Sequence, residues 1–458
     1  MQEMVSVILA AGKGTRMKSS LPKVLHAVAG EPMLRHVLAA AREAGASRTL
    51  VVVGFGGEAV QSAIGAGSEY VVQTEQLGTG HALMQAQPAL AGFAGTVLLL
   101  CGDTPLLRGE TLKNFFAAHR GSGAAATVLT AVPSDATGYG RILRDAGGRV
   151  TGIVEQKDAT AEQLAIGEIN TGIYCFEAAP LFAALSALTC NNAQGEYYLT
   201  DVLAILAQSG QVVGAVVAPD FQEMLGINSR VQLAEAETIL RRRKLVELMD
   251  SGVTVMDPAS TFVDAGVSIG PDTILYPFSW IEGTTTIGRN CRIGPNSRIA
   301  DSRIGDEVTL HFSYAHECKI ADGVTVGPYV HLRPAADLAA GVKVGNFVEI
   351  KNSLIGQGSK VPHLSYIGDT DIGAAVNIGS GTITVNYDGK KKHRTVIGDR
   401  AFVGCNTNLV APVNVGEDSY IAAGSTITKD VPPGSLGVGR ARQLNIAGWT
   451  DKKNSMGG

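Results

Sequence analysis

The stretch IGDRAFVGCNTNLVAPVNVGEDSYIAAGSTI, residues 397–427, decides the fold of the second half of the chain. An aliphatic residue occupies every sixth position from its first residue to its last, and glycine follows several of them. An earlier run repeats the pattern at Ile287, Ile293 and Ile299. A six-residue period is typical of a β-helix, in which each repeat forms one flat side and stacked coils bury a continuous apolar column. The period therefore predicts a parallel β-helix over residues 253–440.

Residues 1–228 have a different pattern, in which short apolar runs alternate with helical segments. The apolar runs lie at 5–11, 50–53 and 96–101, and a helical segment lies at 33–43. This order predicts βαβ units, and so a Rossmann-like α/β domain around a mostly parallel sheet. Residues 229–252 are rich in helix formers up to a Ser-Gly stop, and they predict a helix that connects the two parts. A tail of residues 441–458 completes the predicted organisation.

The composition narrows the classes of protein to which the chain can belong. It has 458 residues, of which 45% are hydrophobic and 17% charged, and its net charge is −4. These values are typical of globular domains and give no basic surface for nucleic acid or for an acidic membrane. The six cysteines form no C-x-x-C pair, and the apolar run near Met1 is too short for a signal sequence or a membrane span. We expect a cytoplasmic protein without nucleic-acid or membrane partners.

A glycine-rich loop follows the first predicted strand, with LAAGKGTRM at residues 9–17 and LPK at residues 21–23. Glycine lets backbone N–H groups approach phosphate oxygens, and the cations Lys13, Arg16 and Lys23 suit a triphosphate. The spacing matches neither the P-loop nor the dinucleotide-binding motif. Taken alone, the loop could equally be a structural turn.

Further motifs in this half narrow the interpretation, because they follow predicted strands, where ligands bind in open α/β sheets. They are QTEQLGTGHA at 73–82, LCGDTP at 100–105, GYGR at 138–141, IVEQK at 153–157, EINTGI at 168–173, QGEYYLTD at 194–201 and GIN at 226–228. With these motifs the chain resembles the sugar-nucleotide pyrophosphorylases, and among them the bifunctional N-acetylglucosamine-1-phosphate uridyltransferases. The resemblance extends from residue 5 to about residue 440.

The resemblance implies a role for each residue of a first site. The nucleotide would be bound by Leu9, Ala10, Ala11, Gly12, Lys23, Gln73, Gly78 and Thr79, the acetamido sugar phosphate by Gly140, Glu155, Asn170 and Asn228, and Mg²⁺ by Asp103 and Asn228. A carboxylate and an amide oxygen are hard donors of the kind that Mg²⁺ prefers. Phosphoryl-type transfer depends on alignment and charge neutralisation, so Arg16 and Lys23 would stabilise the departing pyrophosphate. Taken alone, Asp103 could equally be a turn or helix-cap residue.

The β-helix half carries motifs of charged and titratable residues on a few coils, whereas most of its coils show no candidate catalytic or binding motif. The motifs are HLRP at 331–334, GNFVEIK at 345–351 and PHLSY at 362–366. Residues 381–394 then interrupt the six-residue count as an inserted loop, and insertions in a solenoid often lie on the binding face. The cations Arg333, Lys351 and Lys392 suit a sugar phosphate, and His363 can deprotonate an amine. Singly, each could instead be a surface charge or a structural histidine.

The same resemblance implies that the β-helix is left-handed, carries a glucosamine-1-phosphate acetyltransferase and assembles as a homotrimer. His363 would be the general base that lets the sugar amine attack acetyl-CoA, and Glu349 would orient its ring. The sugar phosphate would be bound by Arg333, Lys351, Tyr366, Asn377 and Lys392, and acetyl-CoA by Ser380, Asn386, Tyr387, Cys405, Ala423 and Arg440. Asn386 and Tyr387 would come from a neighbouring subunit.

Cys405 departs from the family pattern, in which serine is usual at this position. Because a thiol is a weaker hydrogen-bond donor than a hydroxyl, a coenzyme contact from this side chain would be weaker, whereas backbone contacts would remain. No activating base adjoins Cys405 in sequence, so we do not expect it to carry the acetyl group.

Three interpretations follow from the sequence. The preferred one is a bifunctional enzyme that acetylates glucosamine-1-phosphate with acetyl-CoA and then transfers UMP from UTP to N-acetylglucosamine-1-phosphate, releasing pyrophosphate. The second is a single-activity sugar-nucleotide pyrophosphorylase whose β-helix serves assembly or regulation. The third is a non-catalytic scaffold, which would have no need for Arg16, Lys23, Asp103 and His363.

Overall fold

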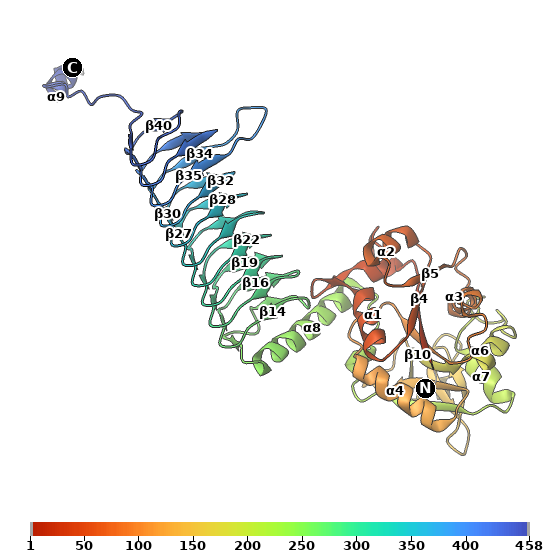
Figure 1. Ribbon diagram of the computed structural model, residues 1–458. Coiled ribbons are helices and arrows are strands. Elements are labelled where there is room, and N and C mark those ends of the chain that lie inside the picture. The colour runs from red at the N-terminus through yellow and green to blue at the C-terminus, as the bar shows by residue number, and fades with distance from the viewer. Residues whose placement is uncertain (1–2, 456–458) are drawn as a thin grey trace. The chain divides into compact units, whose positions relative to one another are not determined.

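The computed structural model describes residues 3–455, and the chain folds as two compact units (Figure 1). Unit 1 ends at Leu240 and unit 2 begins at Arg241, so the division falls within helix α8 (Arg230–Asp250). The predicted stretch of helix formers forms this helix. Its residue Ala236 is buried in unit 1, whereas Leu245 is buried in unit 2. Between residues 3 and 455, no helix is long and apolar enough to cross a membrane.

A mixed sheet forms the centre of unit 1, with the strand order β11-β7-β10-β6-β1-β4-β5. The strands are β1 (Met4–Ala10), β4 (Arg48–Val53), β5 (Glu69–Val72), β6 (Thr96–Cys101), β7 (Ala126–Ala131), β8 (Arg141–Arg144), β9 (Val150–Val154), β10 (Ile169–Glu177) and β11 (Val213–Val217). Strands β6, β1, β4 and β5 are parallel, as are β7 and β11. The sheet is less parallel than predicted, because β10 runs antiparallel to both of its neighbours and β8 pairs with its end.

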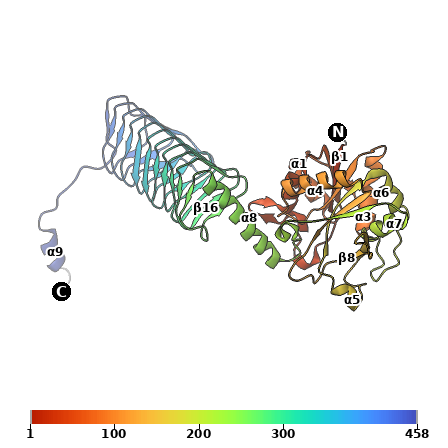
Figure 2. The ribbon, with the colours of Figure 1, turned by 90° about the horizontal axis from the view of Figure 1, so that it is seen from below.

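Helices cover both faces of this sheet, and each face has its own apolar core (Figure 2). The helices on one face are α1 (Met33–Glu43), α2 (Gly57–Ile64) and α4 (Gly109–Ser122), and those on the other are α3 (Thr79–Ala86), α6 (Ala178–Leu185) and α7 (Asp201–Gln208). The shorter elements are η1 (Thr15–Met17), η2 (Lys23–Leu25), β2 (Ala27–Val28), β3 (Glu31–Pro32), η3 (Pro88–Leu90), α5 (Ala161–Leu164) and η4 (Phe221–Met224). The loops that follow β1, β5 and β6 therefore meet at one edge of a sheet that is covered on both sides.

Unit 2 is a three-sided left-handed β-helix, and each side is a parallel sheet of short strands (Figure 1). The first face contains β12 (Thr254–Val255), β15 (Ile274–Leu275), β18 (Arg292–Ile293), β21 (Thr309–Leu310), β24 (Thr325–Val326), β27 (Lys343–Asn346), β30 (Lys360–His363), β33 (Asn377–Ile378), β36 (Phe402–Val403), β39 (Tyr420–Ile421) and β41 (Leu436–Gly437). The second face contains β13 (Phe262–Val263), β16 (Ser279–Glu282), β19 (Ser297–Ala300), β22 (Tyr314–His316), β25 (His331–Leu332), β28 (Glu349–Lys351), β31 (Tyr366–Gly368), β34 (Ile383–Val385), β37 (Asn408–Val410) and β40 (Thr426–Ile427). The third face contains β14 (Ser268–Ile269), β17 (Thr286–Ile287), β20 (Arg303–Ile304), β23 (Lys319–Ile320), β26 (Asp337–Leu338), β29 (Leu354–Ile355), β32 (Thr370–Ile372), β35 (Thr395–Ile397) and β38 (Val413–Val415).

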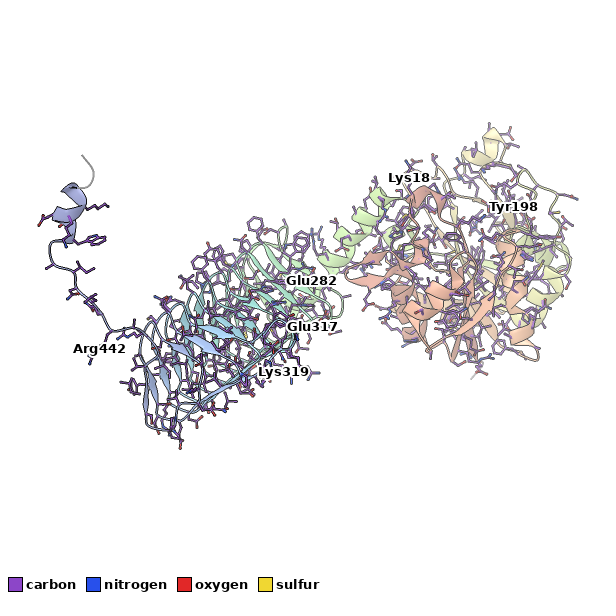
Figure 3. The ribbon with its side chains drawn as sticks, turned by 90° about the horizontal axis from the view of Figure 1, so that it is seen from above. Lys18, Tyr198, Glu282, Glu317, Lys319 and Arg442 are labelled. Carbon is purple, nitrogen blue, oxygen red and sulfur yellow. The ribbon has the colours of Figure 1, made fainter. Side chains whose placement is uncertain are left out.

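The six-residue period corresponds to the side chains that point into the β-helix. Ile287 is 5% exposed, and Ile293 and Ile299, on the next two sides, are fully buried. They belong to one continuous apolar core that extends from Leu245 on α8 to Val431 near the far end. The predicted β-helix is therefore confirmed. Beyond β41 the chain leaves the coils through Arg442 and ends in helix α9 (Trp449–Ser455) (Figure 3).

Candidate active sites

A cavity of about 330 Å³ lies in unit 1, where β1 and β6 end. Its wall consists of Leu9, Ala10, Ala11, Gly12, Lys23, Val24, Gln73, Gln76, Gly78, Thr79, Ala82, Cys101, Asp103 and Glu196. All eight residues that were predicted to bind the nucleotide are among them. The fold thus brings together segments that are far apart in sequence.

Gly78 is fixed in this wall by backbone geometry that only glycine adopts easily. Its φ is +108°, and a Cβ atom there would lie 2.6 Å from the carbonyl oxygen of Tyr197. The Gly78 carbonyl accepts a hydrogen bond from Nε2 of Gln73 at 3.2 Å. The Gln73 side chain is buried, so its amide is held in place beside the cavity.

The two predicted magnesium ligands lie next to one another, with the Lys23 ammonium between them. Nζ of Lys23 forms an ion pair with Asp103 and donates a hydrogen bond of 2.9 Å to Oδ1 of Asn228. The Lys23 ammonium therefore lies between the Asp103 carboxylate and the Asn228 amide oxygen. One carboxylate and one amide oxygen fit Mg²⁺, which completes its shell with water and phosphate oxygens. No cluster of three or more His, Cys, Asp or Glu residues that could hold a metal exists in residues 3–455.

Three of the four predicted sugar-binding residues form a second group in unit 1, whereas Asn228 lies beside Lys23. The backbone N–H of Asn170 donates to the carbonyl of Gly140 at 2.9 Å, and Oδ1 of Asn170 accepts from the Tyr174 hydroxyl at 2.9 Å. A Cβ on Gly140 would lie 3.5 Å from Oε2 of Glu155. Burial raises the pKa of Glu155, and a hydrogen bond from Thr200 opposes this effect.

Arg16 is not part of the cavity wall. It lies on η1 with an exposed side chain, whereas Lys23 reaches the cavity. The sequence reasoning missed Gln76 and Glu196, which line the cavity. Nε2 of Gln76 donates to the carbonyl of Ala11 at 2.9 Å and so ties two loops together. Both missed residues stand inside motifs that the sequence had already singled out.

The β-helix aligns several predicted residues at one of its corners, at or just after the ends of the strands of the first face. Asn346, His363, Ser380, Cys405 and Ala423 follow one another there on successive coils, and we call them the corner column. Asn346 and His363 are register partners. Further along, the carbonyls of Ser380 and Cys405 each accept a backbone hydrogen bond of 2.7 Å from the next coil. Cys405 is exposed and free, and the coils are about 4.8 Å apart.

The three predicted cations lie close to one another in unit 2. Arg333 and Lys351 lie on adjacent coils of the second face, and the Lys392 side chain reaches Lys351 from the inserted loop. Contact with Lys392 is the main cause that lowers the pKa of Lys351, and burial and Arg333 lower it further. An anion bound here would relieve this repulsion.

His363 has a different partner from the one predicted. Its Nδ1 lies 2.6 Å from Oδ1 of Asn346, whereas Glu349 accepts a hydrogen bond of 2.8 Å from Nη1 of Arg333. The expectation that Glu349 orients His363 is therefore wrong for this structure. The physical reason is register, because Glu349 pairs with Tyr366 on the second face.

The inserted loop begins after β34 and projects beside the coils (Figure 1). Asn386 donates a hydrogen bond of 2.5 Å to the buried Asp369 of the same chain and lies 3.4 Å from the Tyr366 hydroxyl. Tyr387 is 57% exposed and forms a β-bridge with Lys392. Asp388 accepts bonds from two backbone N–H groups and from His393, and these lower its pKa to about 2.

The remaining predicted residues lie nearby on the last coils. Asn377 begins β33 and is partly buried. Arg440 follows β41 with an exposed side chain, and its Cδ would lie 4.0 Å from a Cβ on Gly424. Arg440 therefore lies at the end of the corner column, next to Ala423.

Comparison with known proteins gives the same division of the chain. Residues 6–200 match the MobA-like NTP transferase domain, and residues 266–301 and 394–429 match the bacterial transferase hexapeptide (six repeats). A protein of Heliobacterium modesticaldum named bifunctional protein GlmU is 59% identical over 442 residues, which is 96% of each chain. A protein of the same name from Geobacillus sp. (strain WCH70) is 53% identical over 98% of this chain and 99% of its own. Another, from Exiguobacterium sp. (strain ATCC BAA-1283 / AT1b), is 54% identical over 98% of this chain and 100% of its own. The chain belongs to the bifunctional GlmU family.

Proposed function

We propose that this chain is a bifunctional enzyme of UDP-N-acetylglucosamine synthesis. It acetylates glucosamine-1-phosphate with acetyl-CoA and then transfers UMP from UTP to N-acetylglucosamine-1-phosphate, releasing pyrophosphate. The observation that carries the proposal is that each unit gathers its own charged group, with Lys23 between Asp103 and Asn228 in unit 1, and Lys351 beside Lys392 in unit 2. A β-helix that served only assembly would have no need of the second group.

The cavity of unit 1 offers the groups that uridylyl transfer needs. Gln73 and the backbone at Gly78 would hold the uracil, and backbone N–H groups of residues 9–12 would face the phosphates. Mg²⁺ held by Asp103 and Asn228 would neutralise phosphate charge. The sugar phosphate oxygen attacks the α-phosphorus in line with the departing pyrophosphate, so no protein nucleophile is required.

On the β-helix, Arg333, Lys351 and Lys392 would bind the phosphate of glucosamine-1-phosphate. His363 takes a proton from the sugar amine while the amine nitrogen attacks the thioester carbonyl of acetyl-CoA. The new amide bond forms as the carbon–sulfur bond breaks, and coenzyme A leaves as its thiol. Ser380, Cys405 and Ala423 continue the corner column from His363 and so offer a path for the coenzyme.

We further propose that the working unit is a homotrimer in the cytoplasm. The acetyl site lies on open faces of the β-helix, and the exposed Tyr387 on the inserted loop is available to a neighbouring copy. Asn386 donates a hydrogen bond to Asp369 of its own chain. This bond would hold the start of the inserted loop in place while Tyr387 contacts the neighbouring copy. All six cysteines are free, which favours a reducing compartment.

An assay with single omissions tests the proposed function. The enzyme would be supplied with glucosamine-1-phosphate, acetyl-CoA, UTP and Mg²⁺, and thiol and pyrophosphate release would be followed separately. We expect omission of UTP or Mg²⁺ to stop pyrophosphate release alone, and omission of acetyl-CoA to stop both. The single-activity alternative predicts a different result. The enzyme would then release pyrophosphate from UTP and N-acetylglucosamine-1-phosphate, but it would release no thiol from glucosamine-1-phosphate and acetyl-CoA.

A further inference from the structure

We infer that Asn346 is a positioning residue of the acetyl site, and that its side-chain carbonyl fixes the tautomer of His363 so that Nε2 accepts the proton. The inference rests on the proposed acetyl transfer and deepens it. Asn346 ends β27, His363 ends β30, and the two residues are register partners on adjacent coils. Their side chains meet at 2.6 Å between Oδ1 and Nδ1.

The chemistry of this contact determines which ring nitrogen carries the hydrogen. An amide oxygen only accepts hydrogen bonds, so Nδ1 of His363 must donate. In the neutral imidazole, Nε2 then keeps its lone pair and can accept a proton from an amine. Among residues 3–455, no protein group is hydrogen-bonded to Nε2 of His363, which is exposed at the corner. The same contact also fixes the direction in which the ring points.

The backbone around the pair is fixed on both coils. A Cβ on Gly345 would overlap the carbonyl oxygen of Pro362, so only glycine lets the two coils approach this closely. The backbone N–H of Leu364 donates to the Asn346 carbonyl at 3.0 Å, and the Ser365 hydroxyl donates to the His363 carbonyl at 2.8 Å. Asn346 and His363 are thus presented to each other by a rigid frame.

Glu349, the carboxylate to which the resemblance gave this role, is already engaged. Its Oε1 accepts the bond from Arg333, and both side chains lie on the second face. Asn346 orients the ring without adding a negative charge beside the base, whereas a carboxylate would favour the protonated imidazole. The structure therefore assigns the orienting role to an amide.

The test compares three variants by steady-state kinetics of acetyl transfer. Asn346→Leu keeps the side-chain size but removes the acceptor, and we expect kcat to fall about 10²-fold, the lower end of a general-base contribution. The KM values for glucosamine-1-phosphate and acetyl-CoA should stay within about twofold, because Asn346 holds His363 and not the substrates. Asn346→Asp restores an acceptor and should recover most of kcat. Asn414→Ala removes a similar contact between coils, to Asp430 on another face, and should leave the kinetics unchanged.

A second measurement reads the tautomer without activity. Nitrogen NMR of protein labelled at its nine histidines, with His363 assigned by comparison with His363→Ala, should find the proton on Nδ1 in the wild type. In Asn346→Leu the population should move toward the Nε2–H form. A wild-type His363 in the Nε2–H form, or full kcat in Asn346→Leu, would overturn the inference. Failure of the proposed function looks different, because the wild type itself would then release no thiol from acetyl-CoA.

Discussion

The two units build their sites in opposite ways. Unit 1 lines a cavity of about 330 Å³ with loops drawn from distant parts of the chain, whereas unit 2 presents its residues as a column along one corner of a solenoid. The first arrangement surrounds a ligand, and the second offers one side of a binding surface. This difference explains why a partner copy is needed in the proposal for the β-helix and not for the cavity.

The two sites also differ in how their charged side chains are paired. In unit 1 the cation Lys23 is paired with the anion Asp103. In unit 2 the cations Lys351 and Lys392 face one another, and this contact lowers the pKa of Lys351. The first group is neutralised before a ligand arrives, whereas the second is completed by an anion. A phosphate should therefore bind the β-helix by relieving repulsion.

The largest expected effect separates the two sites completely. In His363→Ala the general base is lost, and acetyl transfer should fall about 10³-fold, within the usual range for such a group. Uridylyl transfer should stay close to the wild-type rate, because the variant lies in the other unit. Thiol release from acetyl-CoA and pyrophosphate release would be measured on the same preparation. Equal loss of both activities would mean that the sites are not independent, and unfolding would then be checked by circular dichroism.

The reverse experiment removes the Mg²⁺ that we propose for unit 1. We expect Asp103→Ala, or chelation of Mg²⁺, to reduce pyrophosphate release by about 10²-fold or more, because charge neutralisation supplies much of phosphoryl-transfer catalysis. Acetyl transfer should be unchanged under both treatments. Asp272→Ala, which alters an exposed carboxylate of the β-helix, is the control. If acetyl transfer also required Mg²⁺, the contrast between the two sites would be lost.

A smaller effect tests how tightly the cavity wall of unit 1 is built. Gly78→Ala would place a methyl group 2.6 Å from the Tyr197 carbonyl at a φ of +108°, so we expect the loop to shift and kcat/KM for UTP to fall about 10-fold. Gly65→Ala is a matched control, because Gly65 has a φ of +83° but nothing within 4 Å of its Cβ position. A normal kcat/KM in Gly78→Ala would mean that the loop around Gly78 can accept a methyl group without disturbing the UTP site.

The parts of the structure that were predicted best are those that repeat. The helix expected at 33–43 is α1, and the strand expected at 96–101 is β6, with the same bounds. The six-residue period located the β-helix core because inward side chains are determined locally, by position within a coil. Strand direction is not encoded in such patterns, and this is why the reversal of β10 was missed.

The site residues were harder to predict where they depend on register between coils. In this β-helix the residues that touch across coils lie one full turn apart in sequence, as Asn346 and His363 do. The family resemblance assigned Glu349 to orient His363, although that side chain belongs to the second face. Counting one turn back from His363 would have found Asn346. In unit 1 no such rule exists, because Gln76 and Glu196 reach the same cavity only through the folding of loops.

The smallest expected effect concerns Glu155 and stability. Burial raises its pKa above the usual 4.5, so the folded state resists ionisation of this carboxyl. At a pH below 4.5 both folded and unfolded states hold the proton and there is no penalty. As the pH rises from 4.5 toward the raised pKa, the carboxyl ionises in the unfolded state but stays protonated in the folded state. The wild type therefore loses stability. Glu155→Gln cannot ionise, so its midpoint of urea unfolding should rise relative to the wild type as the pH increases above 4.5.

This measurement follows unit 1 by far-ultraviolet circular dichroism, because its helices dominate that signal. Glu58→Gln, on the exposed side of α2, is the control and should give no pH-dependent difference. Uridylyl transfer should fall in Glu155→Gln even as stability rises, since the carboxylate is expected to hold the sugar. A gain in stability at neutral pH together with a loss of activity would show that the buried carboxyl of Glu155 lowers the stability of unit 1 while it serves uridylyl transfer.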